Sequence, residues 1–459
     1  MRLRKLFHLV VLSILMVLIS YLMMACMDSY DKTVELKEFM IAYNEKCSYK
    51  YSGSILVAKG DRILLEEGYG MADYKNAIPN QPNTLFAIGS ITKSFTALAI
   101  MQLQEKGLID VNDPISKYLD GNRYGDEITI HHLLTHTSGL PWDGKVQGET
   151  YVPLEDNINY INKLFLMFQP GTSYGYSNAG YQLLAAIIEK VSGKSYNDYI
   201  ENNLFKPLSM ADSICGNDAS YHANQSIGYH IDLNKNEQLQ IYNFSAILGS
   251  GNIYSTVQDL FKYSRALDSN QLLGEVSTNE LFKPHWGDLS NGYGYGWRIS
   301  ELYGHQMISH GGSIGGGGYT SLMIKFPEND YTLIFLTNNA DNNALYEVSG
   351  VMSAILLGEN YIFPGELEVI NINPDTLRKY TGTYVDEEGS GIVLYQQNDK
   401  LYVQHRDGAT YELLPVSDIQ FHYKEHENTI FRFTIDINEN ITGVEGSSGG
   451  VVYQWKRVN

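Results

Sequence analysis

Ser90 and Lys93 are the two residues whose types and spacing suggest covalent chemistry most directly. Lys93 is the only charged residue in the stretch 85–104, which otherwise has the composition of an apolar helix. A helix that is apolar on all sides is expected to be buried, and an ammonium group there is costly unless it is hydrogen-bonded or loses its proton. Residues three apart share one face of a helix. A neutral Lys93 amine could therefore accept the proton of the Ser90 hydroxyl and turn that hydroxyl into a nucleophile.

The Ser-x-x-Lys spacing alone does not establish this pair. Ser29 and Lys32 have the same separation in a polar stretch that carries no other chemical signal. The alternative interpretation is that Ser90 caps a core helix and Lys93 extends along it to solvent. The apolar surroundings of Lys93 favour the catalytic interpretation.

A second candidate lies in the glycine-punctuated loop 171–178, which leads into an expected helix. A phenol at Tyr176 with a pKa lowered by a neighbouring ammonium could pass protons to a leaving group. The amide of Asn178 could bind both the lysine and a substrate peptide group. The alternative makes Asn178 a helix N-cap and Tyr176 a core aromatic residue.

The third candidate is the segment 309–313, immediately before an apolar strand-like run. Glycines such as Gly312 at a strand edge allow a ligand to approach the backbone closely. His310 would face the substrate and act as a part-time cation. The backbone N–H of Ser313 and an N–H at the start of the Ser90 helix would stabilise a developing oxyanion.

Three motifs in series resemble those of the class C β-lactamase-like serine hydrolases, a family that includes penicillin-binding DD-peptidases and esterases: Ser90-x-x-Lys93, Tyr176-x-Asn178 and His310-x-Gly312. Segments 133–141 and 293–297 also resemble framework motifs of that family, and the resemblance extends over residues 35 to 360. It implies these roles: Ser90 as acylated nucleophile, Lys93 as general base, Tyr176 as catalytic tyrosine, Asn178 as polar partner, and His310, Gly312 and Ser313 as substrate-binding residues.

Two departures from that family affect the expected substrate. His310 stands where β-lactamases usually carry a Lys that holds the substrate carboxylate, so we expect D-amino-acid peptides or esters to be preferred over β-lactams. The glycine run 315–318 is longer than the family's usual spacing, which leaves the position of the Ser313 donor open. The expected function is hydrolysis of amide or ester bonds through an acyl-enzyme. The alternative is a penicillin-binding sensor that is acylated at Ser90 without turnover.

Two other enzyme classes have partial signals in the sequence. The segments 311–315 and 446–450 match Gly-x-Ser-x-Gly, but each is expected to lead into a strand, whereas a nucleophile elbow leads into a helix. His132 and His136 stand one helical turn apart, as in some zinc sites, but no acidic residue lies between them. The resemblance makes His136 structural, and we expect neither a metal nor a cofactor.

The elements that would position these residues indicate an α+β fold. They are, in order, strands 54–59 and 62–67, helices 90–106 and 178–191, strands 319–326 and 331–337, and a closing helix 344–357. Strands at both ends with helices between them suggest one antiparallel sheet shared by the two ends of the unit. The resemblance implies a β-lactamase/transpeptidase-like fold, with a sheet flanked by helices and an all-helical region.

From residue 374 onward the sequence consists of short, aromatic-rich runs separated by turn residues, which predicts a small all-β domain. It resembles the lipocalin-like β-barrel that is often appended to such enzymes. The expected organisation is a signal or anchor in 1–26, a hydrolase domain in 35–362 and a β-barrel domain in 370–459.

The N-terminal segment has the layout of an export signal, with a basic start followed by an apolar run over 6–25. Cleavage, retention as a membrane anchor and lipidation at Cys26 remain open, and each would place the bulk of the chain outside a bacterial membrane, tethered to its outer face or secreted. Two further cysteines, Cys47 and Cys215, allow at most one disulfide. The net charge of -19 argues against a nucleic-acid partner, so the expected partners are a small substrate and, through the N-terminus, the membrane.

Overall fold

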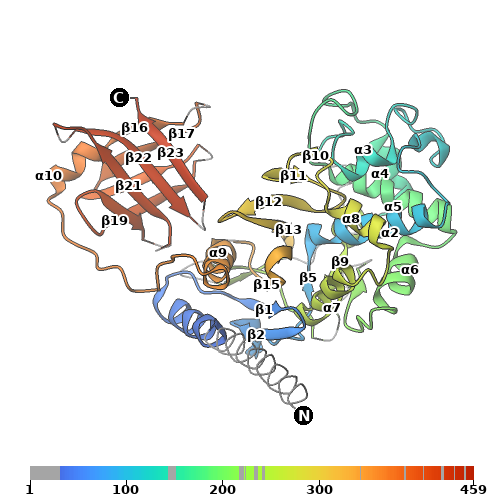
Figure 1. Ribbon diagram of the computed structural model, residues 1–459, viewed down its shortest axis with the longest axis horizontal. Coiled ribbons are helices and arrows are strands. Elements are labelled where there is room, and N and C mark those ends of the chain that lie inside the picture. Colours follow the sequence, from blue (N-terminus) through green and yellow to red (C-terminus); the bar gives the residue numbers. More distant parts are fainter. Residues whose placement is uncertain are drawn as a thin grey trace, which may run out of the picture.

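The structure is a computed structural model that describes residues 32–142, 151–216, 222, 224–231, 236–239, 243–341, 343–386, 389–406, 408–424, 428–438, 440–448 and 451–458. In these residues an eight-stranded antiparallel sheet forms the centre of the larger unit (Figure 1). Its strands, in spatial order, are β10 (Trp286–Gly287), β11 (Asn291–Tyr293), β12 (Arg298–Leu302), β13 (His305–Ile314), β14 (Tyr319–Phe326), β15 (Tyr331–Thr337), β1 (Gly53–Lys59) and β2 (Arg62–Tyr69). The N-terminal and C-terminal parts of the unit meet where β1 pairs with β15.

Each face of this sheet carries its own hydrophobic cluster. Successive side chains of a strand point to opposite faces, so Ile55 packs in one cluster and Leu56 in the other. The first cluster lies between the sheet, the helix over residues 32–46 and α9 (Asn343–Leu357). On the other face, α7 (Val257–Asp268) packs on β1 and β15. The continuous apolar strands of the sequence are therefore explained by burial on both sides.

The helical region lies beside this second face and provides much of the active-site framework. Its helices are α2 (Thr92–Glu105), α3 (Ile130–Leu134), α4 (Leu154–Ile161), α5 (Asn178–Ser192), α6 (Tyr196–Ile200) and α8 (Glu275–Phe282). Helix α2 is buried along almost its whole length, as its composition predicts. Helix α5 ends at Gly193, which adopts a left-handed conformation with φ of 69° and stops the helix as predicted.

Two short strand pairs and a three-stranded sheet complete the larger unit. The pairs are β3 (Met71–Asp73) with β4 (Ile78–Pro79) and β7 (Tyr229–Ile231) with β8 (Asn236–Gln238). In the three-stranded sheet, β9 (Ile253–Ser255) lies between β5 (Phe86–Ala87) and β6 (Ile214–Cys215). The strand β5 leads directly into the turn that carries Ser90, because it is followed by the 3-10 turn η1 (Gly89–Ile91) and then by α2.

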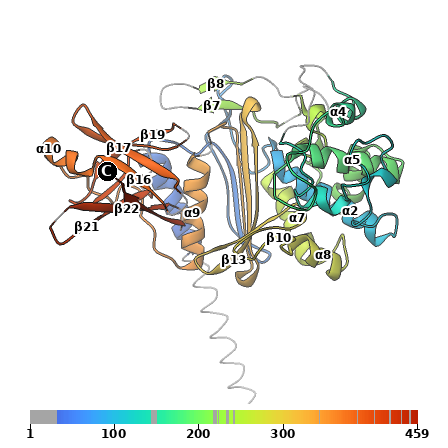
Figure 2. The same ribbon diagram turned by 90° about the horizontal axis from the view of Figure 1, so that it is seen from above.

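The C-terminal region forms a closed barrel, in which β16 pairs with β23. Its strands are β16 (Gly382–Val385), β17 (Gly391–Gln397), β18 (Lys400–Gln404), β19 (Thr410–Pro415), β20 (Gln420–Tyr423), β21 (Ile430–Ile435), β22 (Ile441–Ser448) and β23 (Val451–Arg457), and α10 (Pro374–Leu377) precedes them. The barrel has its own hydrophobic core. Both views show α9 between the main sheet and the barrel (Figures 1 and 2).

The predicted α+β fold with a β-lactamase-like sheet and a C-terminal barrel is confirmed. Several elements were not predicted, among them α7, α8 and the strands β10, β11 and β12 of the larger unit, the barrel strands β20 and β22, and the helix over 32–46. The helix is rich in charged residues, although its buried residues Leu36, Phe39, Met40 and Tyr43 follow the i, i+3, i+4, i+7 pattern that indicates an amphipathic helix. Strand β22 contains two glycines, which are depleted in strands.

Cys47 and Cys215 are both buried, and neither takes part in a disulfide within the described residues. They belong to different hydrophobic clusters, so the possible disulfide is not formed. The apolar segment 6–25 and Cys26 lie outside the described residues. Within the described part of the chain, no helix is both long enough and apolar enough to cross a bilayer.

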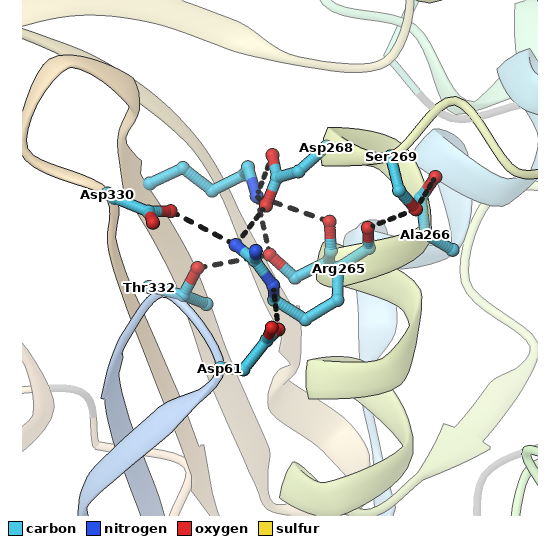
Figure 3. A network of polar contacts seen from close by, with 9 residues as sticks. Asp61, Arg265, Ala266, Asp268, Ser269, Asp330 and Thr332 are labelled. Carbon is cyan, nitrogen blue, oxygen red and sulfur yellow. Dashed lines mark hydrogen bonds and ion pairs between the residues drawn. The ribbon is translucent and has the colours of Figure 1, made fainter.

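A charged network fixes α7 to the sheet (Figure 3). The buried Lys325 of β14 lies 2.8 Å from a carboxylate oxygen of Asp268, and Arg265 bonds to Asp61, Asp268 and Asp330 within 3.0 Å. Burial lowers the pKa of Lys325, and Asp268 opposes this effect because it stabilises the charged amine. The network joins α7 to β14 and to the two turns that carry Asp61 and Asp330.

Candidate active site

The amine of Lys93 lies at the centre of the site and is fully buried. Its Nζ is 3.0 Å from Ser90 Oγ, 2.7 Å from Asn178 Oδ1 and 2.8 Å from the carbonyl oxygen of Ser250. Burial holds the pKa of Lys93 well below its usual range. The alternative in which Lys93 extends to solvent is therefore wrong. Ser90 is not a helix cap either, because α2 has Ile91 at its N-cap position.

These three contacts determine the direction of proton transfer when the amine is neutral. A neutral amine has two N–H donors and one lone pair. The oxygen atoms of Asn178 and Ser250 can only accept hydrogen bonds, so they take the two donors. The lone pair is then directed to the Ser90 hydroxyl, which donates to it. This is the arrangement that a general base requires before nucleophilic attack.

The loop before α5 places Tyr176 and Asn178 beside Lys93. Ser177 is the N-cap of α5, and its backbone N–H donates to Nδ1 of His136 at 3.0 Å. The imidazole of His136 packs on the ring of Tyr176 with 4.1 Å between centroids. Because Ser177 performs the capping, the side chain of Asn178 is available for Lys93. His136 is a positioning residue, as the family resemblance implies.

Tyr176 lies over Lys93, whose Nζ is 4.8 Å from the centre of the phenol ring. The expected lowering of the Tyr176 pKa by a neighbouring ammonium is wrong for this structure. Burial raises the pKa, and a hydrogen bond with Ser90 and the charge of Arg298 oppose that rise only in part. The reason is that Lys93 itself is neutral. Tyr176 is thus a neutral phenol that contacts the Ser90 hydroxyl and could relay a proton.

His310 faces the site from β13 and is almost fully buried. Its Nδ1 is 2.7 Å from the carbonyl oxygen of Gly311, so this nitrogen carries the hydrogen. Its Nε2 then accepts from the hydroxyl of Tyr293 at 3.0 Å. This pair of contacts suits the neutral imidazole, and burial lowers the pKa of His310 to about 3. The expectation that His310 is a part-time cation is wrong, because burial disfavours the charged imidazole and the positive charge of Arg298 disfavours it further.

Two glycines allow β13 to approach the turn that carries Ser90. Gly89 has a φ of 50°, and a Cβ on it would lie 2.8 Å from the backbone nitrogen of Ser313. A Cβ on Gly312 would lie 2.0 Å from the carbonyl oxygen of Ile88. No side chain fits at either position, so the glycines bring the backbones of Ser90 and Ser313 together. Strand β13 continues to Ile314 before the glycine run, which leaves Ser313 paired with Thr320 of β14.

The framework motif around Tyr293 supports the same centre from the other side. Gly296 has a φ of 77°, and a Cβ on it would lie 2.8 Å from the carbonyl oxygen of Lys93. The neighbouring Trp297 is fully buried. This segment therefore packs directly on α2 at the lysine, which accounts for the alternation of two glycines and three aromatic residues here.

Arg298 follows this motif directly and was not singled out in the sequence. A cavity of about 790 Å³ contains Ser90, Tyr176, Asn178 and His310 in its lining, and Arg298 is the only residue with a permanent charge among the described lining residues. Its guanidinium lies 5.9 Å from the centre of the Tyr176 ring. The sequence signal that could have identified Arg298 is its position directly after the framework motif 293–297. Its role depends on the register of β12, where it pairs with Ser309 beside His310.

His132, the adjacent His131 and the Gly-x-Ser-x-Gly segment 311–315 have structural roles in this fold. His132 Nδ1 accepts from the backbone N–H of Thr129 and closes a capping box at α3. His131 Nδ1 lies 2.8 Å from the Tyr295 hydroxyl. In the described residues, no group of three or more His, Cys, Asp or Glu side chains is placed to hold a metal ion. Ser313 lies within a strand, and the next regular strand is β14, so the segment 311–315 is not a nucleophile elbow.

Comparison with known proteins agrees with this geometry. The β-lactamase family model matches residues 46–349. Penicillin-binding protein 4* of Bacillus subtilis (strain 168) is 31% identical over 85% of this chain and 91% of its own length. Teichoic acid D-alanine hydrolase of Staphylococcus aureus (strain MRSA252) is 27% identical over 64% of this chain and 72% of its own length. The structure of the octameric penicillin-binding protein homologue from Pyrococcus abyssi aligns with a TM-score of 0.61 and 28% identity, covering 88% of this chain and 95% of that one. The chain belongs to the β-lactamase family of serine hydrolases.

The neutral state of His310 leads to a prediction about pH. Between about pH 5.5 and 8 an ordinary imidazole loses its charge, whereas His310, with a pKa of about 3, stays neutral throughout. The KM for a substrate that carries a carboxylate should therefore remain constant over this range. A neutral ester measured in parallel separates this effect from changes at the nucleophile. A KM that rises only for the anionic substrate, with a midpoint near the usual imidazole pKa of 6.5, would contradict this assignment.

Proposed function

We propose that this protein is an extracytoplasmic hydrolase that cleaves amide or ester bonds of D-amino-acid peptides or esters through an acyl-enzyme at Ser90. One observation carries the proposal: a buried, neutral Lys93 amine has both of its protons engaged and its lone pair directed at the Ser90 hydroxyl. A hydrolase with this pair needs no metal ion to generate its nucleophile. The predicted export signal over 6–25 supports the location outside the membrane.

The proposed reaction begins with attack of Ser90 Oγ on the carbonyl carbon while Lys93 takes the hydroxyl proton. The carbonyl oxygen gains the electron pair and accepts hydrogen bonds from the backbone N–H groups of Ser90 and Ser313. When the bond to the leaving group breaks, the phenol of Tyr176 delivers a proton to that group and is reprotonated from Lys93. A water molecule then attacks the acyl-enzyme by the same route in reverse and releases the acid.

The charge of the cavity supports an anionic substrate. Arg298 is the permanent cation among the described lining residues, and it takes the place that His310 was expected to fill. A guanidinium binds a carboxylate with two parallel hydrogen bonds, which suits the C-terminus of a D-alanyl peptide. The names of the two relatives described above, a penicillin-binding protein and a teichoic acid D-alanine hydrolase, are consistent with a D-alanyl substrate.

Substitution of the catalytic pair tests the chemical step. Ser90→Ala and Lys93→Met should each lower kcat on a D-alanyl ester by about 10³-fold or more, because nucleophile and base act as a unit. Lys106→Met, the same change at an exposed position at the end of α2, is the matched control and should leave kcat unchanged. Full activity in Ser90→Ala would disprove the mechanism.

Mass spectrometry of the intact protein distinguishes a hydrolase from a sensor. After exposure to a D-alanyl ester, a fluorophosphonate or penicillin, the adduct should map to Ser90. With the ester, we expect the adduct to disappear as free acid is released. A stable adduct with every substrate would instead support the penicillin-binding sensor that is acylated without turnover.

The role of Arg298 can be tested with a pair of substrates that differ only in charge. Arg298→Ala should raise KM for an acyl-D-alanyl-D-alanine by about 10- to 100-fold, which corresponds to the loss of one charge-assisted hydrogen-bonded pair. For the corresponding C-terminal amide, the KM of Arg298→Ala should rise by less than about threefold. Arg298→Lys, which keeps the charge but loses the bidentate geometry, should give an intermediate KM. Equal effects of Arg298→Ala on the acid and the amide would argue against carboxylate binding.

A further inference from the structure

We propose that the open end of the barrel that faces α9 is a second subsite, which binds an apolar or aromatic group on the acyl side of the substrate. This subsite rests on the proposed function, because its ligand is part of the molecule that acylates Ser90. The barrel would then set substrate preference, although none of its residues takes part in the chemistry. We call this region the barrel subsite, and it comprises the residues that line the cavity between α9 and the barrel.

The barrel subsite is a cavity of about 460 Å³ between α9 and the barrel. Cavities of about 300 to 1,000 Å³ are typical of small-molecule sites, and barrel mouths are a common place for them. Its described lining residues are Asn343, Tyr346 and Glu347 of α9 and His405, Ala409, Tyr411, Tyr423, Thr429, Phe431, Gly446, Ser447, Tyr453 and Trp455 of the barrel. Aromatic rings account for much of the barrel side of this lining.

The aromatic rings on the barrel side form a continuous row. Tyr453 stacks on Trp455 with 5.7 Å between centroids, and Trp455 stacks on Phe431 at 6.3 Å. The row continues through Tyr423, at 5.1 Å from Phe431, to Tyr411 at 4.6 Å from Tyr423. Stacked and tilted rings at these separations form a rigid apolar wall. Such a wall can bury the face of an aromatic ring or an alkyl chain at low entropic cost.

A glycine in β22 allows this wall to form. A Cβ on Gly446 would lie 2.7 Å from the indole ring of Trp455, which is closer than any side chain allows. The indole therefore lies close to the backbone of β22 at Gly446, and both residues line the cavity. The absence of a side chain at Gly446 has no benefit for strand stability. Its effect is to keep the barrel subsite open.

Two tyrosines connect the barrel subsite with the active-site cavity, because Tyr346 and Tyr453 line both. Both side chains are about half exposed, at 52% and 50%. The hydroxyl of Tyr346 lies 3.7 Å from the place where a Cβ on Gly311 would be, next to His310. Strand β12 pairs with β13 only as far as Ser309, so it does not cover the edge of β13 at Gly311. A substrate bound at Ser90 can pass this edge and reach the barrel.

The charges at the two ends give the substrate its direction. Arg298 would hold a carboxylate at the active-site end, which is the leaving-group side of a D-alanyl-D-alanine peptide. The described lining of the barrel subsite contains no Lys or Arg, and its one carboxylate, Glu347, accepts a hydrogen bond from the Tyr43 hydroxyl at 3.1 Å. An anionic group is therefore disfavoured there, and an uncharged apolar group fits. That group belongs to the acyl side.

A matched pair of peptides tests the barrel subsite in the full-length protein. N-acetyl-Gly-Gly-D-Ala-D-Ala and N-naphthylacetyl-Gly-Gly-D-Ala-D-Ala differ only in the group that would reach the barrel. The ratio of their kcat/KM values, naphthyl over acetyl, should be well above one for the unaltered protein. Tyr453→Ala should lower this ratio by about 3- to 10-fold, as expected for the loss of one aromatic contact, and Tyr453→Phe should retain it.

Val452→Ala is the matched control, because Val452 is the adjacent residue of β23, is 57% exposed and lies outside both cavity linings. The naphthyl-to-acetyl ratio of kcat/KM for Val452→Ala should equal that of the unaltered protein. An equal ratio in Tyr453→Ala and the unaltered protein would overturn the proposal. If neither peptide is hydrolysed, the proposed function fails separately. The subsite can then still be tested by measuring, through naphthyl fluorescence, how tightly the naphthyl peptide binds to Ser90→Ala. Adding Tyr453→Ala to this protein should weaken the binding, and unchanged affinity would overturn the proposal.

Discussion

The structure of the site depends on one buried amine, that of Lys93, which is shielded from solvent and has no counter-ion among the described residues. Among the described residues, the hydrogen-bond partners of the Lys93 amine are one hydroxyl, one amide oxygen and one backbone carbonyl, and none of them is a carboxylate. An ammonium in this position would be poorly compensated, so the fold stabilises the neutral form. The two oxygen acceptors then orient the lone pair. Burial favours the unprotonated amine, which can accept a proton, and hydrogen bonding directs its lone pair.

Many features of the surrounding fold serve to hold partners against this amine. Gly296 lets the segment after β11 pack on the backbone of α2, and Gly89 and Gly312 let β13 reach the turn that carries Ser90. His136 fixes the loop that carries Tyr176. Burial also favours the uncharged forms of Tyr176 and His310, which lie beside Lys93. Arg298 is consequently the permanently charged group among the described lining residues of the cavity.

Much of this could be predicted from the sequence. The isolated Lys93 in an apolar helix, the order of the three motifs and the strand pattern led to the correct fold class and brought Ser90, Lys93, Tyr176, Asn178 and His310 into one site. The protonation states of Tyr176 and His310 could not be predicted, because they depend on burial by residues distant in sequence. Arg298 was missed since its function depends on strand register, and the link through Tyr346 and Tyr453 depends on how the barrel sits against α9.

The most direct test of this account is the pKa of Lys93 itself. The full-length protein with ¹³C at the ε carbon of lysine can be titrated by NMR, and Lys93→Met identifies the relevant signal. We expect that signal to show a neutral amine at neutral pH, where the other lysines are still charged. If it titrates with them, near the usual lysine value of 10.5, the amine is an ammonium in the resting protein and cannot act as the base for Ser90.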